Sequence, residues 1–258
     1  MSEQSTAGTA PLTQVKAGSF SLLLPTFVFT TLLSSMLLFL VQPLMARLTL
    51  PLLGGSPSVW AVSMCFFQAA LLIGYAYAHL LIRFVPLRAG MAIHILLMMV
   101  AVQLLPAQVS ADTTAAFAGW PESLSLLAVL ATSIGLPFAV MSANAPLIQA
   151  WFSVSGHKDA AQPYFLYGAS NLGSMAALLL YPTVFEPLIG LHDQTQAWAG
   201  GFGVLTAALF ACAGLIVLQN RSATATAHAA PAVADAAPPI TWARRAYWLT
   251  MAFVPSAL

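Results

Sequence analysis

Residues 21–45 read SLLLPTFVFTTLLSSMLLFLVQPLM and contain no charged side chain. A helix needs about 20 predominantly apolar residues to cross a hydrocarbon core of roughly 30 Å, and this stretch is long enough. It also exceeds the apolar core of a cleavable signal peptide and continues to Arg47 without a clear small-residue cleavage site. The stretch therefore predicts a retained membrane-spanning helix.

The same pattern recurs along the chain, because the charged residues leave long uncharged windows between them. These runs are rich in Leu, Ala and Met and do not alternate, so they favour helices, whose backbone groups bond to one another and need no partner from lipid. The sequence predicts an all-α integral membrane protein with six transmembrane helices. We place the spans at Ser21–Met45, Val59–Leu81, Met91–Leu105, Leu124–Ala143, Tyr164–Leu188 and Trp198–Leu218.

The composition of the whole chain supports a membrane protein. Of its 258 residues, 60% are hydrophobic and 6% are charged, whereas soluble domains carry about 25% charged residues. The net charge of +1 gives no basic field, so no nucleic-acid partner is expected. Cys65 and Cys212 lie in apolar runs without metal-ligand spacing, so we expect neither a metal site nor a cofactor.

Basic residues are divided unequally between the two sides of the predicted bundle. If the chain crosses six times, Arg47 lies alone on one side. The other seven basic residues share the opposite side: Lys16, Arg83, Arg88, Lys158, Arg221, Arg244 and Arg245. Since cytoplasmic loops carry the excess of Lys and Arg, this distribution predicts a cytoplasmic N-terminus.

Composition also divides the chain into segments. Residues 1–19 are predicted to form a short cytoplasmic tail before the six-helix domain at 20–220. The Ala- and Pro-rich stretch 221–243 is predicted to be a disordered cytoplasmic linker. In the last segment, 244–258, Arg244 and Arg245 precede the apolar run Tyr247–Leu258, which is too short to cross a bilayer, so the segment is either an interfacial helix or the start of an incomplete seventh helix. We favour the incomplete seventh helix, and therefore a chain that is a fragment.

Four stretches together carry a family resemblance. They are VQPLMARLTLPLLGGSPSVW (41–60), FFQAALLIGYAYAHLL (66–81), SIGLPFAVMSANAPLIQAWF (133–152) and PYFLYGASNLGSMAALLLYPTVFEPLIGL (163–191). They resemble the N-terminal membrane part of the bacterial fused major-facilitator/spermidine-synthase proteins. The resemblance implies half of a major-facilitator-like bundle in the bacterial inner membrane, with a cytoplasmic linker after its sixth helix.

The resemblance also implies partners and limits the expected activity. The lipid bilayer and further membrane helices are the expected partners, the latter from a missing C-terminal half, a homo-oligomer or a larger complex. A connection to polyamines follows from the family name only. Longer relatives carry an aminopropyltransferase domain, but its glycine loop and acidic residues have no counterpart here, so we expect no enzyme.

Residues 74–90 occupy the place of the family's gating loop. They match that loop at Gly74, Arg83 and Arg88, although its aspartate is missing here.

Amide side chains give the candidate site within the spans. Lipid cannot satisfy their hydrogen bonds, so they must bond across helices or line a polar path, and we favour interhelical contacts. Several lie close to prolines, which break helices at transporter sites. The candidate residues are Gln42, Gln68, Asn144, Asn171 and Tyr167.

The remaining polar residues of the spans have simpler interpretations. His79 and His94 are expected to pack near the cytoplasmic boundary, with a proton or substrate role as the alternative. Arg47 and Glu186 are candidates for an ion pair on the outer face. The leading functional hypothesis is a transporter-like module, and the alternative is a non-transporting membrane scaffold or accessory subunit.

Overall fold

The computed structural model describes residues 17–53, 56–109, 111–224 and 241–256. Most of the predicted tail and the central part of the predicted linker, 225–240, lie outside the described residues. The chain divides into two compact units, Met1–Ala223 and Thr224–Leu258.

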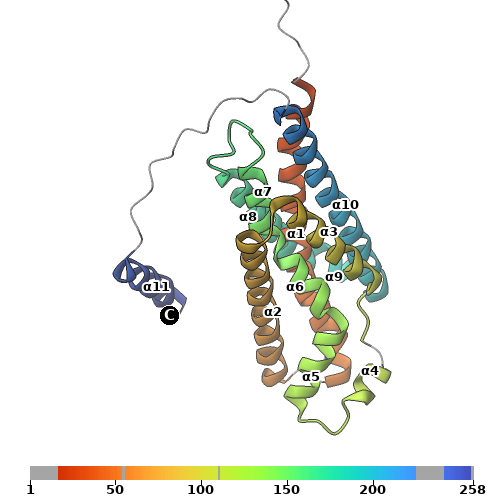
Figure 1. Cartoon of the computed structure of the whole chain (residues 1–258). Coiled ribbons are helices and arrows are strands. Elements are labelled where there is room, and N and C mark those ends of the chain that lie inside the picture. Colours follow the sequence, from red (N-terminus) through yellow and green to blue (C-terminus); the bar gives the residue numbers. More distant parts are fainter. Residues whose placement is uncertain (1–16, 54–55, 110, 225–240, 257–258) are drawn as a thin grey trace, which may run out of the picture. The chain divides into compact units, whose positions relative to one another are not determined.

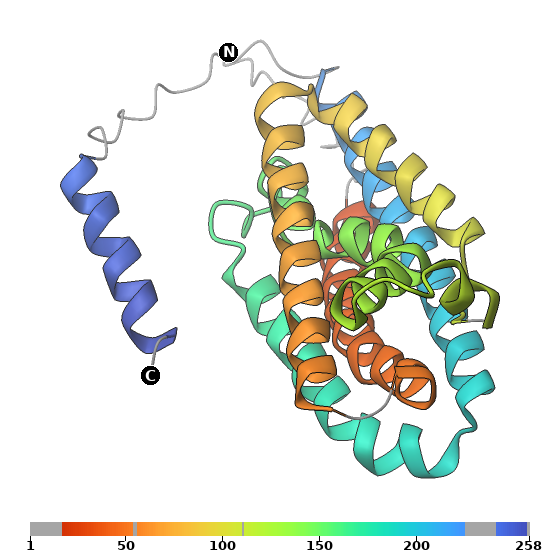
Figure 2. The same cartoon turned by 90° about the horizontal axis from the view of Figure 1, so that it is seen from below.

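The first unit is built from helices that run alternately up and down a single bundle (Figure 1). No strand occurs in the described part of the chain. Four rods, α2, α3, α8 and α10, surround α1 and the α5–α7 rod, which lie in the middle (Figure 2). The helices are α1 (Ala17–Leu53), α2 (Pro57–Phe84), α3 (Leu87–Gln103), α4 (Ala111–Ala116), α5 (Glu122–Leu130), α6 (Leu136–Ser142), α7 (Asn144–Ser153), α8 (Tyr164–Leu180), α9 (Glu186–Leu188) and α10 (Leu191–Thr224).

Four helical stretches of the described residues are long and apolar enough to cross a membrane. They are Leu22–Pro51, Pro57–Phe84, Glu122–Ser153 and Leu191–Gln219, while Leu87–Gln103 is apolar but shorter. The all-helical class and the presence of several membrane-length helices therefore agree with the sequence. The count of six spans and the type of bundle stay predictions.

The outer bounds of several helices differ from those expected. Helix α1 extends from Ala17 to Leu53 and passes through Arg47, and α10 begins at Leu191 and ends at Thr224. Helix α1 thus includes residues 17–19 of the predicted tail and α10 includes residues 221–224 of the predicted linker, while the division of the chain into these segments stays a prediction. These helices extend beyond the uncharged stretches of sequence. A charged or polar side chain does not end a helix as long as the backbone N–H groups still bond to the carbonyls four residues earlier.

Two of the rods are irregular because of proline: the fourth rod, formed by α5, α6 and α7, and the fifth rod, formed by α8 and α9. π-Helical turns at Ala131–Gly135 and Tyr181–Phe185 interrupt them, and Ala143 separates α6 from α7. Proline lacks the N–H that would bond to the carbonyl four residues earlier, so Pro146 leaves the Ser142 carbonyl without its helical partner. The sequence did not predict that the fourth rod continues beyond Ala143 to Ser153.

Small residues let neighbouring helices approach closely. The buried face of α8 includes Ala169, Gly173 and Ala177, spaced four residues apart, and packs against α1. The buried face of α2 carries the same pattern at Ala70, Gly74 and Ala78, and packs against the α5–α7 rod. Such stripes replace the hydrophobic effect as the basis of helix association in lipid, because they allow close van der Waals contact.

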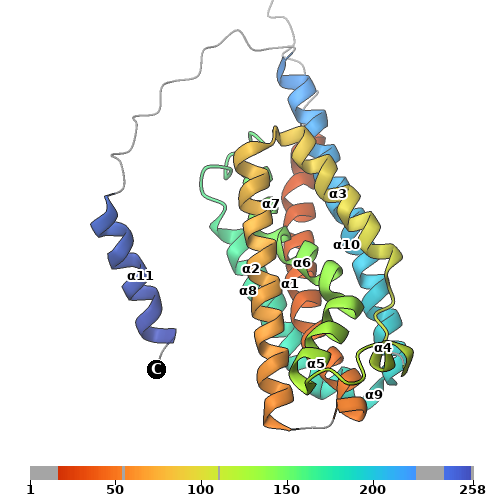
Figure 3. The ribbon, with the colours of Figure 1, turned by 60° about the horizontal axis from the view of Figure 1, so that its bottom comes forward.

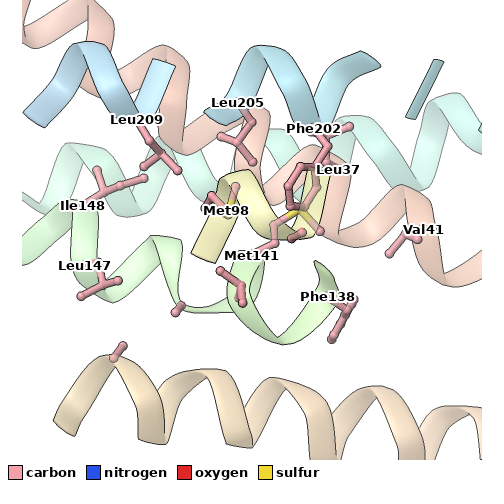
Figure 4. Packing of buried hydrophobic residues seen from close by; sticks show 14 of the residues in the cluster. Leu37, Val41, Met98, Phe138, Met141, Leu147, Ile148, Phe202, Leu205 and Leu209 are labelled. Atoms are coloured by element: carbon pink, nitrogen blue, oxygen red, sulfur yellow. The ribbon is translucent and has the colours of Figure 1, made fainter. Parts of the chain in front are cut away.

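Large apolar side chains fill the centre of the bundle between α1, α3, α6, α7 and α10 (Figure 4). Phe138, Phe202 and Leu205 are fully buried there. Close packing of these side chains fixes the positions of the helices relative to one another. The polar side chains buried in this core are exceptions. Among the labelled members are also Leu37, Val41, Met98, Met141, Leu147, Ile148 and Leu209.

The ends of the bundle differ in charge. The start of α1, the α2–α3 turn, the α7–α8 loop and the end of α10 lie at one end (Figure 3). Arg83 in the last turn of α2, Arg88 in the first turn of α3 and Lys158 in the α7–α8 loop belong to this end. The opposite end carries the acidic first turns of α4, α5 and α10. Within the first unit, the geometry thus places Arg83, Arg88 and Lys158 at the same end, as the sequence assigns them to one side.

The second unit contains one described helix, α11 (Trp242–Ser256). It begins slightly before the segment expected at 244–258. Inside this helix, the Arg244 guanidinium lies 5.4 Å from the centre of the Trp248 ring.

Candidate functional site

A groove of about 550 Å³ lies between α2, α7 and α8, and Phe39 of α1 also lines it. We call it the polar groove, because seven of its lining residues carry hydrogen-bonding side chains. They are Tyr75, His79, Gln149, Tyr167, Ser170, Asn171 and Ser174. Ile82, Ala145 and Pro146 complete the lining.

Helical spacing explains why these side chains gather. On α8, Tyr167, Ser170, Asn171 and Ser174 lie at i, i+3, i+4 and i+7, which places them on one face. This face adjoins the small-residue stripe that packs against α1. On α2, Tyr75 and His79 are four residues apart and so point the same way.

The described lining of the polar groove carries no permanently charged side chain. None of the described residues that line it is Asp, Glu, Lys or Arg. Hydroxyl, amide and imidazole groups can donate and accept hydrogen bonds but cannot neutralise an ion. The groove is therefore suited to an uncharged polar molecule.

A buried hydrogen-bond network lies directly behind the groove. Asn144 on α7 and His94 on α3 are fully buried, and the distance between His94 Nε2 and Asn144 Oδ1 is 2.7 Å. Asn144 Nδ2 donates to Ser34 Oγ of α1 at 3.0 Å. Asn144 immediately precedes the groove residues Ala145 and Pro146, so this network joins three rods at the break between α6 and α7.

The donors and acceptors of the network follow from its geometry. Because the Asn144 amide nitrogen donates to Ser34, its oxygen accepts from His94 Nε2–H. His94 Nδ1 is then the acceptor for the Tyr77 hydroxyl, 3.4 Å away on α2. The Trp151 ring packs edge-on against the imidazole, with 5.9 Å between ring centres. The structure shows that His94 is buried within the bundle against α7, while its expected depth near the cytoplasmic boundary stays a prediction.

The structure separates the residues that the sequence grouped as one candidate site. Asn144 is buried in the network, whereas Asn171 and Tyr167 are exposed along the polar groove. Gln42 is half-buried, and its Nε2 donates to the Leu38 carbonyl of the same helix at 3.4 Å. Gln68 is exposed on α2 and is not part of the groove lining. Neither glutamine makes an interhelical hydrogen bond.

The other predicted positions lie outside the polar groove, except for His79. Arg47 Nε is 4.0 Å from Glu186 Oε1, so the two members of the expected outer-face pair meet, at half-exposed positions. Gly74 lies inside α2, and the connection to α3 is a short turn at Val85–Pro86. The stretch expected to act as a gating loop is therefore mainly helix. Arg83 packs over the Phe84 ring at 5.7 Å.

Sequence reasoning missed several residues of both sites. Tyr75, Gln149, Ser170 and Ser174 line the groove, and Ser34 and Tyr77 belong to the network. The only sequence signal for them is the spacing of three or four residues between polar side chains on the same rod.

No group of three or more His, Cys, Asp or Glu side chains able to hold a metal occurs among the described residues. The chain matches no protein-family model, no curated protein and no solved structure.

Proposed function

We propose that the chain is a multi-pass membrane protein and forms a transporter-like module, in which the polar groove provides one wall of a path for an uncharged polar solute. The proposal rests on the gathering of seven polar side chains in one groove of a bundle that exposes many large apolar side chains. In this proposal the rods of the first unit are six membrane passes, and the family resemblance supports that reading.

The cost of placing unpaired polar groups in lipid indicates that the polar groove is filled with water or covered by another molecule. A hydroxyl or amide without a partner in hydrocarbon costs several kcal/mol, roughly 4–8 by transfer from water to cyclohexane. Asn171 and Tyr167 make no side-chain hydrogen bond within the described chain. They therefore need water, a solute or the polar side chains of another membrane helix.

The helix irregularities beside the groove also support a transport role. Pro146 lines the groove just after the break at Ala143, and interrupted helices line substrate sites in transporters. Alternating access needs a second bundle that moves against the first, so a partner, a second copy or further helices would complete the path.

The absence of charged side chains from the described lining of the polar groove argues against a charged substrate. A polyamine is a polycation and needs carboxylates, and the described lining of the polar groove offers none. An uncharged solute with several hydroxyl or amide groups fits the groove better.

The same neutrality favours one alternative function. Ionisable residues within membrane spans commonly mark ion and proton pathways. His79 is the only histidine in the described groove lining and no acidic or basic residue accompanies it, so a non-transporting scaffold that docks a partner's polar helix face is the second candidate. The two functions differ in whether water enters the groove of the assembled protein.

Cysteine accessibility tests for a water-filled groove. Asn171 lines the groove, whereas its neighbour Leu172 is 51% exposed on a different face of α8 at nearly the same depth. In a Cys65→Ser background, we expect Asn171→Cys to react with a water-soluble maleimide about tenfold faster than Leu172→Cys, since only a hydrated thiol ionises.

The measurement is made on the protein in its native membrane, where any partner is present. Equal rates for the two cysteines would contradict the transporter-like proposal. Slow reaction at both positions, with faster reaction at Asn171→Cys only after solubilisation, would support the scaffold, because a partner then covers the groove.

The orientation has its own test. We propose a cytoplasmic N-terminus, supported by the basic residues at one end of the bundle. An impermeant maleimide should label Ala115→Cys, at the end with α4, in intact cells, and should label Lys158→Cys only after permeabilisation. The reverse pattern would contradict the proposed orientation, and equal labelling of both would contradict the proposed number of passes.

A further inference from the structure

A second cavity of about 170 Å³ lies between α1, the π-helical turn Tyr181–Phe185 and the first turns of α10. It is distinct from the polar groove and shares no lining residue with it. Most of its wall is apolar and comes from α1, through Leu33, Met36, Leu37, Leu40 and Leu44. Two polar side chains, those of Tyr181 and Gln194, also line it.

Gln194 is held in one orientation by the end of the irregular fifth rod. Its Nε2 donates to the carbonyl of Phe185 at 2.9 Å and to that of Ile189 at 2.8 Å. A reversed amide would place its oxygen against these two carbonyl oxygens, so Oε1 must be the other, free end. The residue is 3% exposed, and Oε1 is buried without a hydrogen bond.

The Tyr181 hydroxyl is the other polar group of this lining that is buried and makes no short hydrogen bond within the described chain. The Arg47 guanidinium lies near enough to act as a more distant donor to this hydroxyl, which leaves the Tyr181 O–H able to donate to a ligand. The indole N–H of Trp198, also in the lining, is already used, since it donates to the Leu37 carbonyl at 2.9 Å. The cavity therefore presents one acceptor that requires a donor, and one hydroxyl that can donate or accept.

These needs define a ligand class. A hydroxyl group can donate to the Gln194 amide oxygen and accept from Tyr181, whereas a ketone or ether cannot donate. The apolar wall fits a hydrocarbon body, and an engineered apolar cavity of about 150 Å³ is known to hold benzene. A buried water typically needs two to four polar partners, so water would leave most of this apolar volume unfilled.

We propose that this cavity binds an apolar molecule that carries a single hydroxyl group, donated to Gln194 Oε1. Ala197 lies at its edge and is exposed on the outer surface of α10, which gives the ligand an entry from the membrane. The site would thus sample alcohols dissolved in the lipid phase, independently of the polar groove.

Photolabelling of the whole chain in lipid nanodiscs tests the proposal. The probe is an octanol that carries a diazirine, and its partner is the same diazirine on octane without the hydroxyl. At matched membrane concentrations, we expect the alcohol to label the α1 and α10 residues of the cavity about three- to tenfold more than the alkane, as one net hydrogen bond allows. Unlabelled octanol should compete.

Two variants locate the binding. Ala197→Phe should close the cavity and remove the labelling, whereas Ala207→Phe adds the same bulk to α10 outside this cavity and should not. Tyr181→Phe keeps the ring and removes only the hydroxyl, so it should reduce the preference for the alcohol even if Ala197→Phe fails to fold. Equal labelling by alcohol and alkane, or undiminished labelling in a folded Ala197→Phe protein, would overturn the proposal. So would the absence of cavity labelling, which would show that ordered water alone satisfies Gln194.

Discussion

Replacing Gly173 with alanine is expected to destabilise the bundle by about 3 kcal/mol, at the upper end of the range for overpacked cores. A Cβ atom at this position would overlap the carbonyl oxygen of Leu32 and the hydroxyl of Ser35 on α1. The Leu32 carbonyl belongs to the backbone, so no rotamer change relieves the overlap. The two helices must separate instead, which weakens the close contact on which their association in lipid depends.

Gly168 provides the matched control on the same helix. A Cβ atom there meets no other atom within 4 Å, so Gly168→Ala should be neutral or slightly stabilising through its better helix propensity. Thermal unfolding in detergent, followed by the loss of monodisperse protein, compares the two variants directly. Equal midpoints for Gly173→Ala and Gly168→Ala would show that α1 and α8 do not pack as described.

The sequence predicts the helical class of this fold and some of its helix bounds, because long uncharged runs are visible in local composition. Residues 164–188 form a continuous helical stretch from α8 to α9 with the expected bounds, although α8 is not among the four described helices long and apolar enough to cross a membrane. Which helices touch is a matter of tertiary packing. The Ala169, Gly173 and Ala177 stripe could have indicated a close contact on α8, but nothing in it names α1 as the partner.

The candidate site was less predictable, and Asn144 and Asn171 show why. Both are amides in apolar runs, and the sequence assigned them one role. Asn144 follows a helix break that turns it into the bundle, whereas Asn171 lies on the α8 face beside the buried stripe. Their different environments depend on the rotation of each rod, which residue type alone does not determine.

The two polar sites are connected through α7. The network fixes Asn144, and the next two residues form part of the groove wall. A side chain behind the groove can therefore position the wall without touching a solute. Ala145 and Pro146 would shift if Asn144, at the break between α6 and α7, lost its hydrogen bonds to His94 and Ser34.

Replacing Asn144 with leucine should consequently lower stability by about 3 kcal/mol. The change removes hydrogen bonds to His94 and Ser34, each worth roughly 0.6–2 kcal/mol between membrane helices. It also leaves the His94 Nε2–H buried without its acceptor, at a cost of about 1–3 kcal/mol that overlaps with the first term. Thermal unfolding in detergent measures the loss.

Asn171→Leu is the matched control, since it makes the same chemical change at an exposed position without a side-chain hydrogen bond. It should alter stability by no more than about 0.5 kcal/mol, while impairing whatever the polar groove binds. A double variant that adds His94→Leu to Asn144→Leu should lose less than the sum of the single losses, because the two side chains share one network. Strict additivity, or equal losses for Asn144→Leu and Asn171→Leu, would show that the buried network does not anchor the break between α6 and α7.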